Sequence, residues 1–331
     1  MYHVSFPGLG IHFEINRIAF SIGSFHVYWY GILIAAGFLL AVIYAMKSAG
    51  KFGLDPDKLM NCILVGIICG IVGARAYYVI FYPGDLYIKN PSEIFSIHDG
   101  GLAIYGGVIG GLLGGGITAK ICKQKISSVL DIASLGFLIG QSIGRWGNFI
   151  NQEAFGVQTS LPWGMASENT GFVPVHPCFF YESAWCLLGF ILLHFFSRRL
   201  RHYDGQVFLL YLLWYGIERF FVEGLRTDSL LLPGLALRVS QVLAGVLVIF
   251  SIVMLIVLRR RTVLSGAGSP RIMTLNSIVD EVPEELITDD RQAQLTSGAQ
   301  PEKDAAELEN TPAPKEAEPA VEDNKDKTKK E

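Results

Sequence analysis

Charged and amide side chains gather where an apolar stretch ends, in the run Gly144-Arg145-Trp146-Gly147-Asn148-Phe149-Ile150-Asn151-Gln152-Glu153. Hydrophobic segments seldom keep such groups without a functional reason. The guanidinium of Arg145 can bind a phosphate through two parallel hydrogen bonds, and it stays charged in apolar surroundings. The run therefore predicts an anion site at the edge of a membrane.

A second polar group comes later, where Tyr215, Arg219, Glu223 and Arg226 are spaced to share one face of a helix. Arg219 and Glu223 could simply neutralise each other and join two helices. This pairing does not account for Arg226, which together with Arg145 favours an anion site over a purely structural pair.

The elements that must position these groups are membrane helices. About half of the 331 residues are hydrophobic and 17% are charged, and seven apolar segments are long enough to cross a bilayer. These segments lie near 25–46, 59–82, 101–121, 127–144, 177–197, 205–224 and 236–258. We therefore expect an all-α integral membrane protein with seven transmembrane helices.

Basic residues alternate between the connections, and this alternation predicts the topology. The basic clusters are Lys47, Lys51 and Lys58; Lys120, Lys123 and Lys125; Arg198, Arg199 and Arg201; and Arg259, Arg260 and Arg261. The positive-inside rule makes these connections cytoplasmic, which puts the N-terminus outside and the C-terminus inside. Arg145 and Arg219 then face the same external side, where an arginine excess calls for an anionic partner.

We expect two domains, a membrane domain over 1–261 with a short external segment near 145–176, and a tail over 262–331. The tail carries 8 basic and 16 acidic residues, a composition typical of a disordered acidic segment. Within the membrane domain, glycines at every fourth position predict close helix packing; they are Gly106, Gly110 and Gly114. The residues His98-Asp99-Gly100-Gly101 before them resemble a flexible, polar lip.

Several other chemistries find no support in the sequence. No metal-type pairing of cysteines and no phosphate-loop, HExxH or GxSxG pattern occurs, so we expect no metal, no cofactor and no nucleic-acid binding. Glu182 and Arg75 interrupt apolar stretches, and either could be a structural partner of the other charges.

Five motifs together resemble the bacterial prolipoprotein diacylglyceryl transferases over roughly residues 15–260. They are Tyr28-Trp29-Tyr30-Gly31, Asp99-Gly100-Gly101 with Gly106-Gly107, the run 144–153, His176-Pro177 with Tyr181-Glu182, and Tyr215 through Arg226. The resemblance implies transfer of diacylglyceryl from phosphatidylglycerol to the lipobox cysteine of a prolipoprotein, with release of glycerol phosphate. It also implies a seven-span protein of the bacterial cytoplasmic membrane, whose active site faces outward and whose partners are membrane lipids and prolipoprotein signal peptides.

By motif position, the resemblance assigns phosphate binding and leaving-group stabilisation to Arg145 and Arg219. It places further substrate-binding residues around them, namely Tyr30, Gly101, Gly106, Asn148, Glu223 and Arg226. Many relatives have a histidine where this chain has Tyr105, so a histidine base is not available there. Tyr105 is then expected to orient lipid through a hydrogen bond, while Glu153 or the departing phosphate accepts the thiol proton.

A carrier for an anionic phospholipid or organic phosphate is the main alternative function. Transporters commonly have internal repeats and polar groups along a path through the bilayer. This sequence has no repeat at half length, and its polar groups gather at one face. A scaffold that assembles through its glycines would leave the outer arginines unexplained.

Nothing catalytic is expected in the acidic tail, and its deletion tests the domain division. A chain ending near residue 265 should keep full activity in membranes, because every motif of the resemblance precedes that point. A truncated protein that inserts correctly but is inactive in the transferase assay would contradict this expectation.

Overall fold

The computed structural model describes residues 2–23, 25–96, 100–227, 238–260 and 264. These residues belong to one compact unit, Met1–Met273, and the second unit, Thr274–Glu331, lies outside them. The expected acidic tail therefore falls outside the described residues except for Leu264. So do His98 and Asp99 of the expected polar lip.

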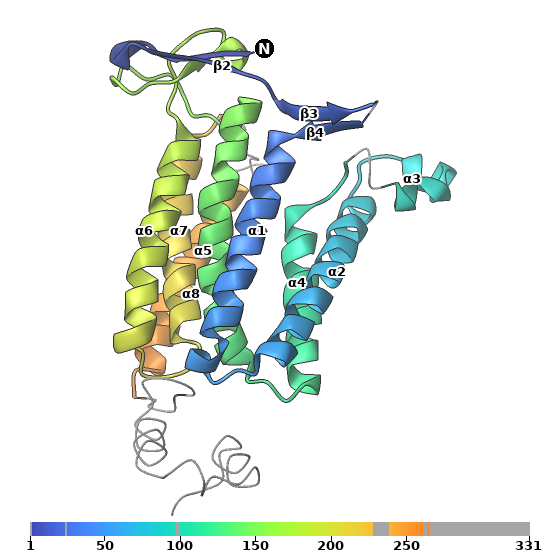
Figure 1. Ribbon diagram of the computed structural model, residues 1–331, viewed down its shortest axis with the longest axis vertical. Helices are drawn as coiled ribbons and strands as arrows, with labels where there is room; N and C mark the ends of the chain where they lie inside the picture. Colours follow the sequence, from blue (N-terminus) through green and yellow to red (C-terminus); the bar gives the residue numbers. More distant parts are fainter. Residues whose placement is uncertain (1, 24, 97–99, 228–237, 261–263, 265–331) are drawn as a thin grey trace, which may run out of the picture. The chain divides into compact units, whose positions relative to one another are not determined.

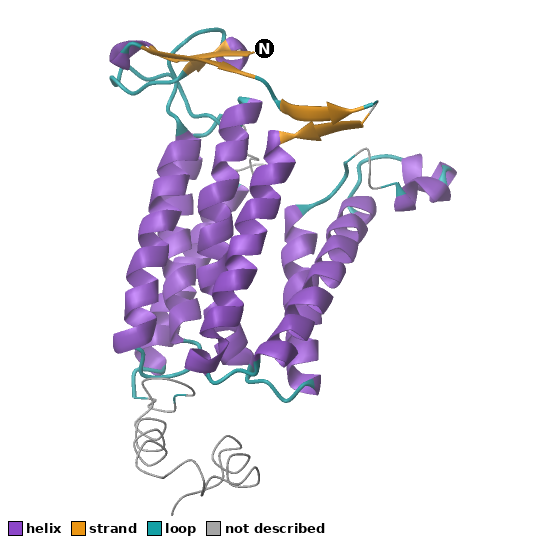
Figure 2. Ribbon diagram, viewed as in Figure 1, coloured by secondary structure: helices purple, strands orange, loops and turns teal. Residues whose placement is uncertain are grey.

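Long helices cover all seven apolar segments in the described part of the chain (Figures 1 and 2): α1 Trp29–Ser48, α2 Pro56–Ile80, α4 Ile104–Ile121, α5 Ile126–Asn151, α6 Cys178–Arg199, α7 Gln206–Leu225 and α8 Val239–Val257. The shortest has 18 residues, which rise about 27 Å, close to the thickness of a bilayer's hydrocarbon core. Six of them are long and apolar enough to cross a membrane. The other is α7, which carries Glu218, Arg219 and Glu223. A mostly helical membrane protein is thus confirmed.

Short strands at one end of the bundle were not predicted (Figure 2). They are β1 Tyr2–Phe6, β2 Ile11–Ile15, β3 Ile18–Ile22, β4 Phe25–Tyr28 and β5 Ala166–Ser167. They form an antiparallel sheet of order β2-β1-β5 and a separate β3-β4 hairpin. Four of them lie in the N-terminal residues, which are too short and too mixed in character to register as an apolar run. We call this the strand end of the bundle.

Short helical turns fill several connections: η1 Pro7–Leu9, η2 Ala49–Phe52, α3 Leu86–Lys89, η3 Pro91–Phe95 and η4 Glu168–Thr170. The start of α2 is capped by Asp55, whose carboxylate accepts hydrogen bonds from the backbone N–H groups of Asp57 and Lys58. The bond from Lys58 is the main reason that the pKa of Asp55 lies below its usual value.

Helix α5 extends to Asn151, well past the end near 144 that hydropathy predicts. The polar run 144–153 therefore begins as the last two turns of a helix and not as a loop. Gln152 ends the helix in a left-handed conformation, with φ of 53°. As a consequence, Arg145 and Asn148 have helical spacing and can point to one side of α5.

The helices form two groups, one of α1, α5, α6, α7 and α8 and the other of α2 and α4 (Figure 1). Helix α1 packs along α5, where Gly37 lies against Gly140. Helices α6 and α7 also contact α5, and α8 packs on α7. Helices α2 and α4 pack chiefly on each other. A Cβ atom at Gly106 or Gly110 would overlap the carbonyl oxygen of a facing residue of α2. The predicted role of the glycine ladder in helix packing is confirmed.

The α2–α4 contact can be tested by substituting alanine for glycine at matched positions of α4. Gly110→Ala should destabilise the protein by about 1–3 kcal/mol, because the added methyl group meets the carbonyl of Cys69. Gly116→Ala is the control, since no atom lies within 4 Å of a Cβ placed there. Thermal unfolding in detergent would measure both. Equal midpoints in the two variants would contradict the packing described here.

Candidate anion site

Two arginines from different helices converge on one buried carboxylate. Glu182, in the second turn of α6, has a side chain that is only 1% exposed. Its Oε2 atom lies 3.0 Å from Nε of Arg145 on α5, and its Oε1 atom accepts a hydrogen bond of 3.0 Å from Nη1 of Arg219 on α7. The two guanidinium groups are thereby held on the same carboxylate.

Arg219 also contacts a carboxylate of its own helix. Its Nη2 atom lies 2.5 Å from Oε2 of Glu223, one turn further along α7. The predicted i,i+4 pair therefore exists, but Arg219 is shared between Glu223 and Glu182. The side chains of Arg145 and Arg219 remain 22% and 17% exposed, so neither side chain is fully buried.

A cavity of about 510 Å³ begins at Arg145 and follows α1 and α5 away from the strand end; Arg219, Glu182 and Glu223 do not line it. Polar side chains line one end of it, namely Tyr30, Arg145 and Asn148, and Ile104 of α4 and Tyr215 of α7 also contribute. The rest of its wall along α1 is apolar, from Ile34 to Ala45. Fifteen residues of helix separate Tyr30 from Ala45, a rise of about 22 Å. The cavity thus fits a molecule with an anionic end and a long apolar body.

Neighbouring residues of the run 144–153 hold the polar end in shape. Glu153 accepts hydrogen bonds from the side-chain amides of Asn148, at 3.0 Å, and Asn151, at 3.3 Å. Gly147 lies so close to Tyr30 that a Cβ atom would overlap the phenol ring. The expected cluster of Arg145, Asn148, Glu153 and Tyr30 is therefore brought together by the structure.

Three other predicted site residues, Gly101, Tyr105 and Gly106, do not line this cavity. Gly106 is buried against Gly73 of α2. Gly101 has a φ of +74°, and its carbonyl accepts a hydrogen bond from Arg75. Tyr105 is 38% exposed and its ring centroid lies 6.4 Å from that of Tyr77; none of the three lines the cavity.

Arg75 and Arg226 have structural surroundings that the sequence did not indicate. Arg75 donates hydrogen bonds to the backbone carbonyls of four residues, Glu93, Ile94, Gly100 and Gly101. It therefore organises the loop before α4. Arg226 follows the last residue of α7, and its backbone pairs with Gly156 in an antiparallel bridge.

The prediction that Glu182 could be a structural partner of other charges is confirmed by its ion pairs with Arg145 and Arg219. The signal was present, since a lone carboxylate in an apolar helix requires a cationic partner, but the sequence alone did not identify Arg145 and Arg219 as its partners. Among the described residues, no group of three or more His, Cys, Asp and Glu side chains could hold a metal ion.

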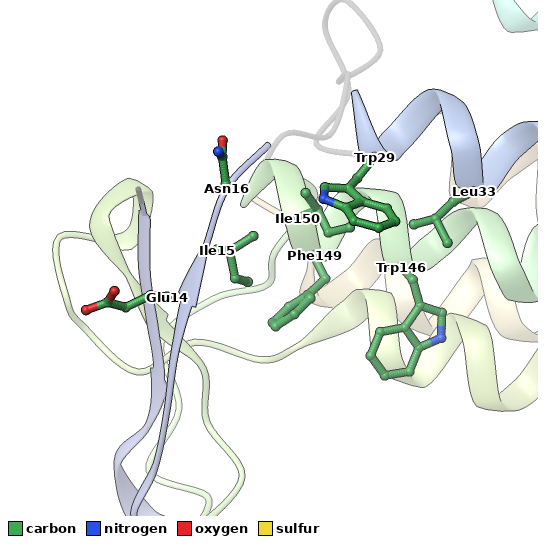
Figure 3. Close-up of a pocket in the computed structure, with 8 residues that line it drawn as sticks. All are labelled: Glu14, Ile15, Asn16, Trp29, Leu33, Trp146, Phe149 and Ile150. Atoms are coloured by element: carbon green, nitrogen blue, oxygen red, sulfur yellow. The ribbon is translucent and has the colours of Figure 1, made fainter. Parts of the chain in front are cut away.

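A second pocket of about 420 Å³ lies under β2 at the strand end. Figure 3 shows Trp29 and Leu33 of α1 facing Trp146 and Phe149 of α5, with Ile15 of β2 to the left of them. This pocket and the cavity at Arg145 use different residues of the same two helices. Its wall is mainly apolar, and it contains none of the predicted site residues.

The comparisons with known proteins agree on one family. The family model described as prolipoprotein diacylglyceryl transferase matches residues 17–257. Three relatives are named phosphatidylglycerol-prolipoprotein diacylglyceryl transferase. The one from Clostridioides difficile (strain 630) is 44% identical over 239 residues, covering 72% of this chain and 94% of the relative.

The relative from Finegoldia magna is 42% identical over 251 residues, which are 76% of this chain and 99% of that protein. The relative from Bacillus cereus (strain 03BB102) is 42% identical over 256 residues, which are 75% of this chain and 93% of that protein. The matched region includes every helix of the bundle and both arginines of the anion site. The chain belongs to the prolipoprotein diacylglyceryl transferase family.

Proposed function

We propose that this chain transfers the diacylglyceryl group of phosphatidylglycerol to the lipobox cysteine of prolipoproteins, the first step of lipoprotein maturation. Family membership and the names of its relatives support this enzymatic activity. The structural observation that carries the proposal is Arg145, which lines the polar end of a long apolar cavity and shares the carboxylate of Glu182 with Arg219. A phospholipid has the same two-part chemistry. The relatives' names do not favour a carrier.

The reaction requires charge stabilisation more than a cofactor. The cysteine sulfur forms a bond to the carbon of the diacylglyceryl group that bears the phosphate ester. The bond between that carbon and the phosphate oxygen breaks. The electron pair of that bond passes to the phosphate, which leaves as glycerol phosphate. We assign phosphate binding to Arg145 and Arg219, because preorganised cations stabilise the charge that grows on a leaving group.

The remaining residues have supporting roles in this proposal. Glu223 holds Arg219 through its ion pair, and Asn148 and Tyr30 border the headgroup end of the cavity. Glu153 or the departing phosphate accepts the thiol proton. Arg226 caps the C-terminal end of α7, three residues after Glu223. Gly101 and Gly106 contribute through the shape of the loop and the α2–α4 contact.

The chain is a multi-pass bacterial membrane protein. We infer that α7 is the seventh span, since two of the charges that lower its hydropathy, Arg219 and Glu223, form ion pairs inside the bundle. The positions of the basic clusters support an external N-terminus, a cytoplasmic C-terminus and an active site toward the external face. A C-terminal reporter that is active only outside the cell would contradict this topology.

Purified protein in detergent should convert phosphatidylglycerol and a lipobox peptide to diacylglyceryl peptide and glycerol phosphate in equal amounts. Arg145→Ala and Arg219→Ala should each lower the rate at least about 100-fold, because each removes a positive charge that stabilises the negative charge growing on the leaving phosphate. Arg199→Ala is the control, since this arginine is exposed at the end of α6. Peptide mass and phosphate release measure the reaction. Binding without turnover in the unaltered protein would support a carrier instead.

The role of Tyr105 can be separated from that of the arginines. Tyr105→Phe removes only the hydroxyl, and we expect a several-fold rise in the KM for phosphatidylglycerol if that hydroxyl orients lipid. The ring contact with Tyr77 would be retained. Unchanged kcat and KM would exclude any required role of the hydroxyl.

A further inference from the structure

Helix α6 is joined to α5 by a reciprocal pair of serine hydrogen bonds beside the anion site. The hydroxyl of Ser142 donates to the backbone carbonyl of Ser183, at 3.1 Å, and the hydroxyl of Ser183 donates to the carbonyl of Ser142, at 2.8 Å. The indole N–H of Trp146 also donates to the Ser183 hydroxyl, at 3.1 Å. Both serines are buried. We call this set the serine clasp.

A second reciprocal pair joins α6 to α7. The indole N–H of Trp185 donates to the carbonyl of Trp214 at 3.1 Å, and the indole N–H of Trp214 donates to the carbonyl of Trp185 at 3.0 Å. The two rings stack with centroids 4.3 Å apart. Gly189 makes room for them, because a Cβ atom there would overlap the indole of Trp214. We call this pair the tryptophan clasp.

Both clasps act on the backbone of α6 within one turn of Glu182. Ser183 directly follows Glu182, and Trp185 lies three residues after Glu182. Side chains that bond to a neighbouring backbone carbonyl fix both the height and the rotation of a helix. A slip of one residue moves a helix by about 1.5 Å, which is enough to break ion pairs of 3.0 Å such as those of Glu182.

We propose that the two clasps are positioning devices for the phosphate site. They hold α6 at the one height at which Glu182 reaches Arg145 on one side and Arg219 on the other. Ser142, Ser183, Trp185 and Trp214 are then positioning residues, which act on bound lipid through Glu182 and do not touch it. The test of this inference by kcat/KM rests on the proposed function. Its test by lipid binding requires only that the anion site binds phosphatidylglycerol.

The first test compares variants that remove a clasp with variants that remove a similar buried hydroxyl elsewhere. Ser183→Ala and Trp214→Phe should each reduce kcat/KM for phosphatidylglycerol about tenfold, since small misplacements of catalytic groups have large effects on rate. Ser134→Ala and Ser251→Ala are the controls. Both serines are buried, and both hydroxyls bond only within their own helices, to Leu130 and Leu247. These controls should stay within twofold of the unaltered protein.

Ser183→Thr keeps the hydroxyl and should restore most of the activity that Ser183→Ala loses. If Ser183→Ala does not fold, Ser142→Ala tests the same clasp and Trp214→Phe tests the other. Losses of equal size in the clasp variants and in the control variants would overturn the proposal, because they would reflect general destabilisation.

The second test asks whether the clasp acts through Glu182. The stabilisation of the protein by phosphatidylglycerol, compared with phosphatidylcholine, is measured for Ser183→Ala, Glu182→Gln and the double variant. We expect Ser183→Ala to weaken binding on its own but not in the Glu182→Gln background. An equal further loss in that background would overturn the proposal. Lipid binding without turnover in the unaltered protein would refute the proposed function and leave this test decisive.

Discussion

A carboxylate removed from water determines how the three central helices can pack. Glu182 is buried in an otherwise apolar helix, and an ionised carboxylate is strongly disfavoured there unless cations compensate it. Arg145 and Arg219 provide that compensation from the helices on either side. Helix α6 must therefore contact both α5 and α7 at one height. The same three residues explain the packing of the helices and the position of the proposed anion site.

The cavity follows from an unequal distribution of helix contacts. Helix α1 approaches α5 closely, at Gly37 and Gly140, while α2 and α4 pack on each other through their glycines. The space that remains between these pairs is lined by apolar side chains except at Tyr30, Arg145 and Asn148 and a few positions deeper in. The polar end of this cavity suits the headgroup of an amphiphilic molecule, and its apolar wall suits the acyl chains. Glycine thus contributes to function here by controlling which helices come into contact.

Much of the fold could be predicted from the sequence because apolar length alone determines where helices can cross a bilayer. The convergence of Arg145 and Arg219 was also predictable, since the alternation of basic connections places both at the same end. That both arginines share Glu182 was not predictable, because helix rotation brings Glu182 between them and a single sequence does not contain that rotation. The extension of α5 to Asn151 was missed for a related reason. Hydropathy counts polar residues as loop even when they face a polar cavity inside the bundle.

The central claim is that Arg145 and Arg219 act as one anion site held by Glu182. A double-mutant cycle on kcat/KM for phosphatidylglycerol, with Arg145→Gln, Arg219→Gln and both together, tests this most directly. If the arginines bind one phosphate together, the double variant should lose little more than the more damaging single variant. A loss equal to the product of the two single losses would show independent roles and contradict the account.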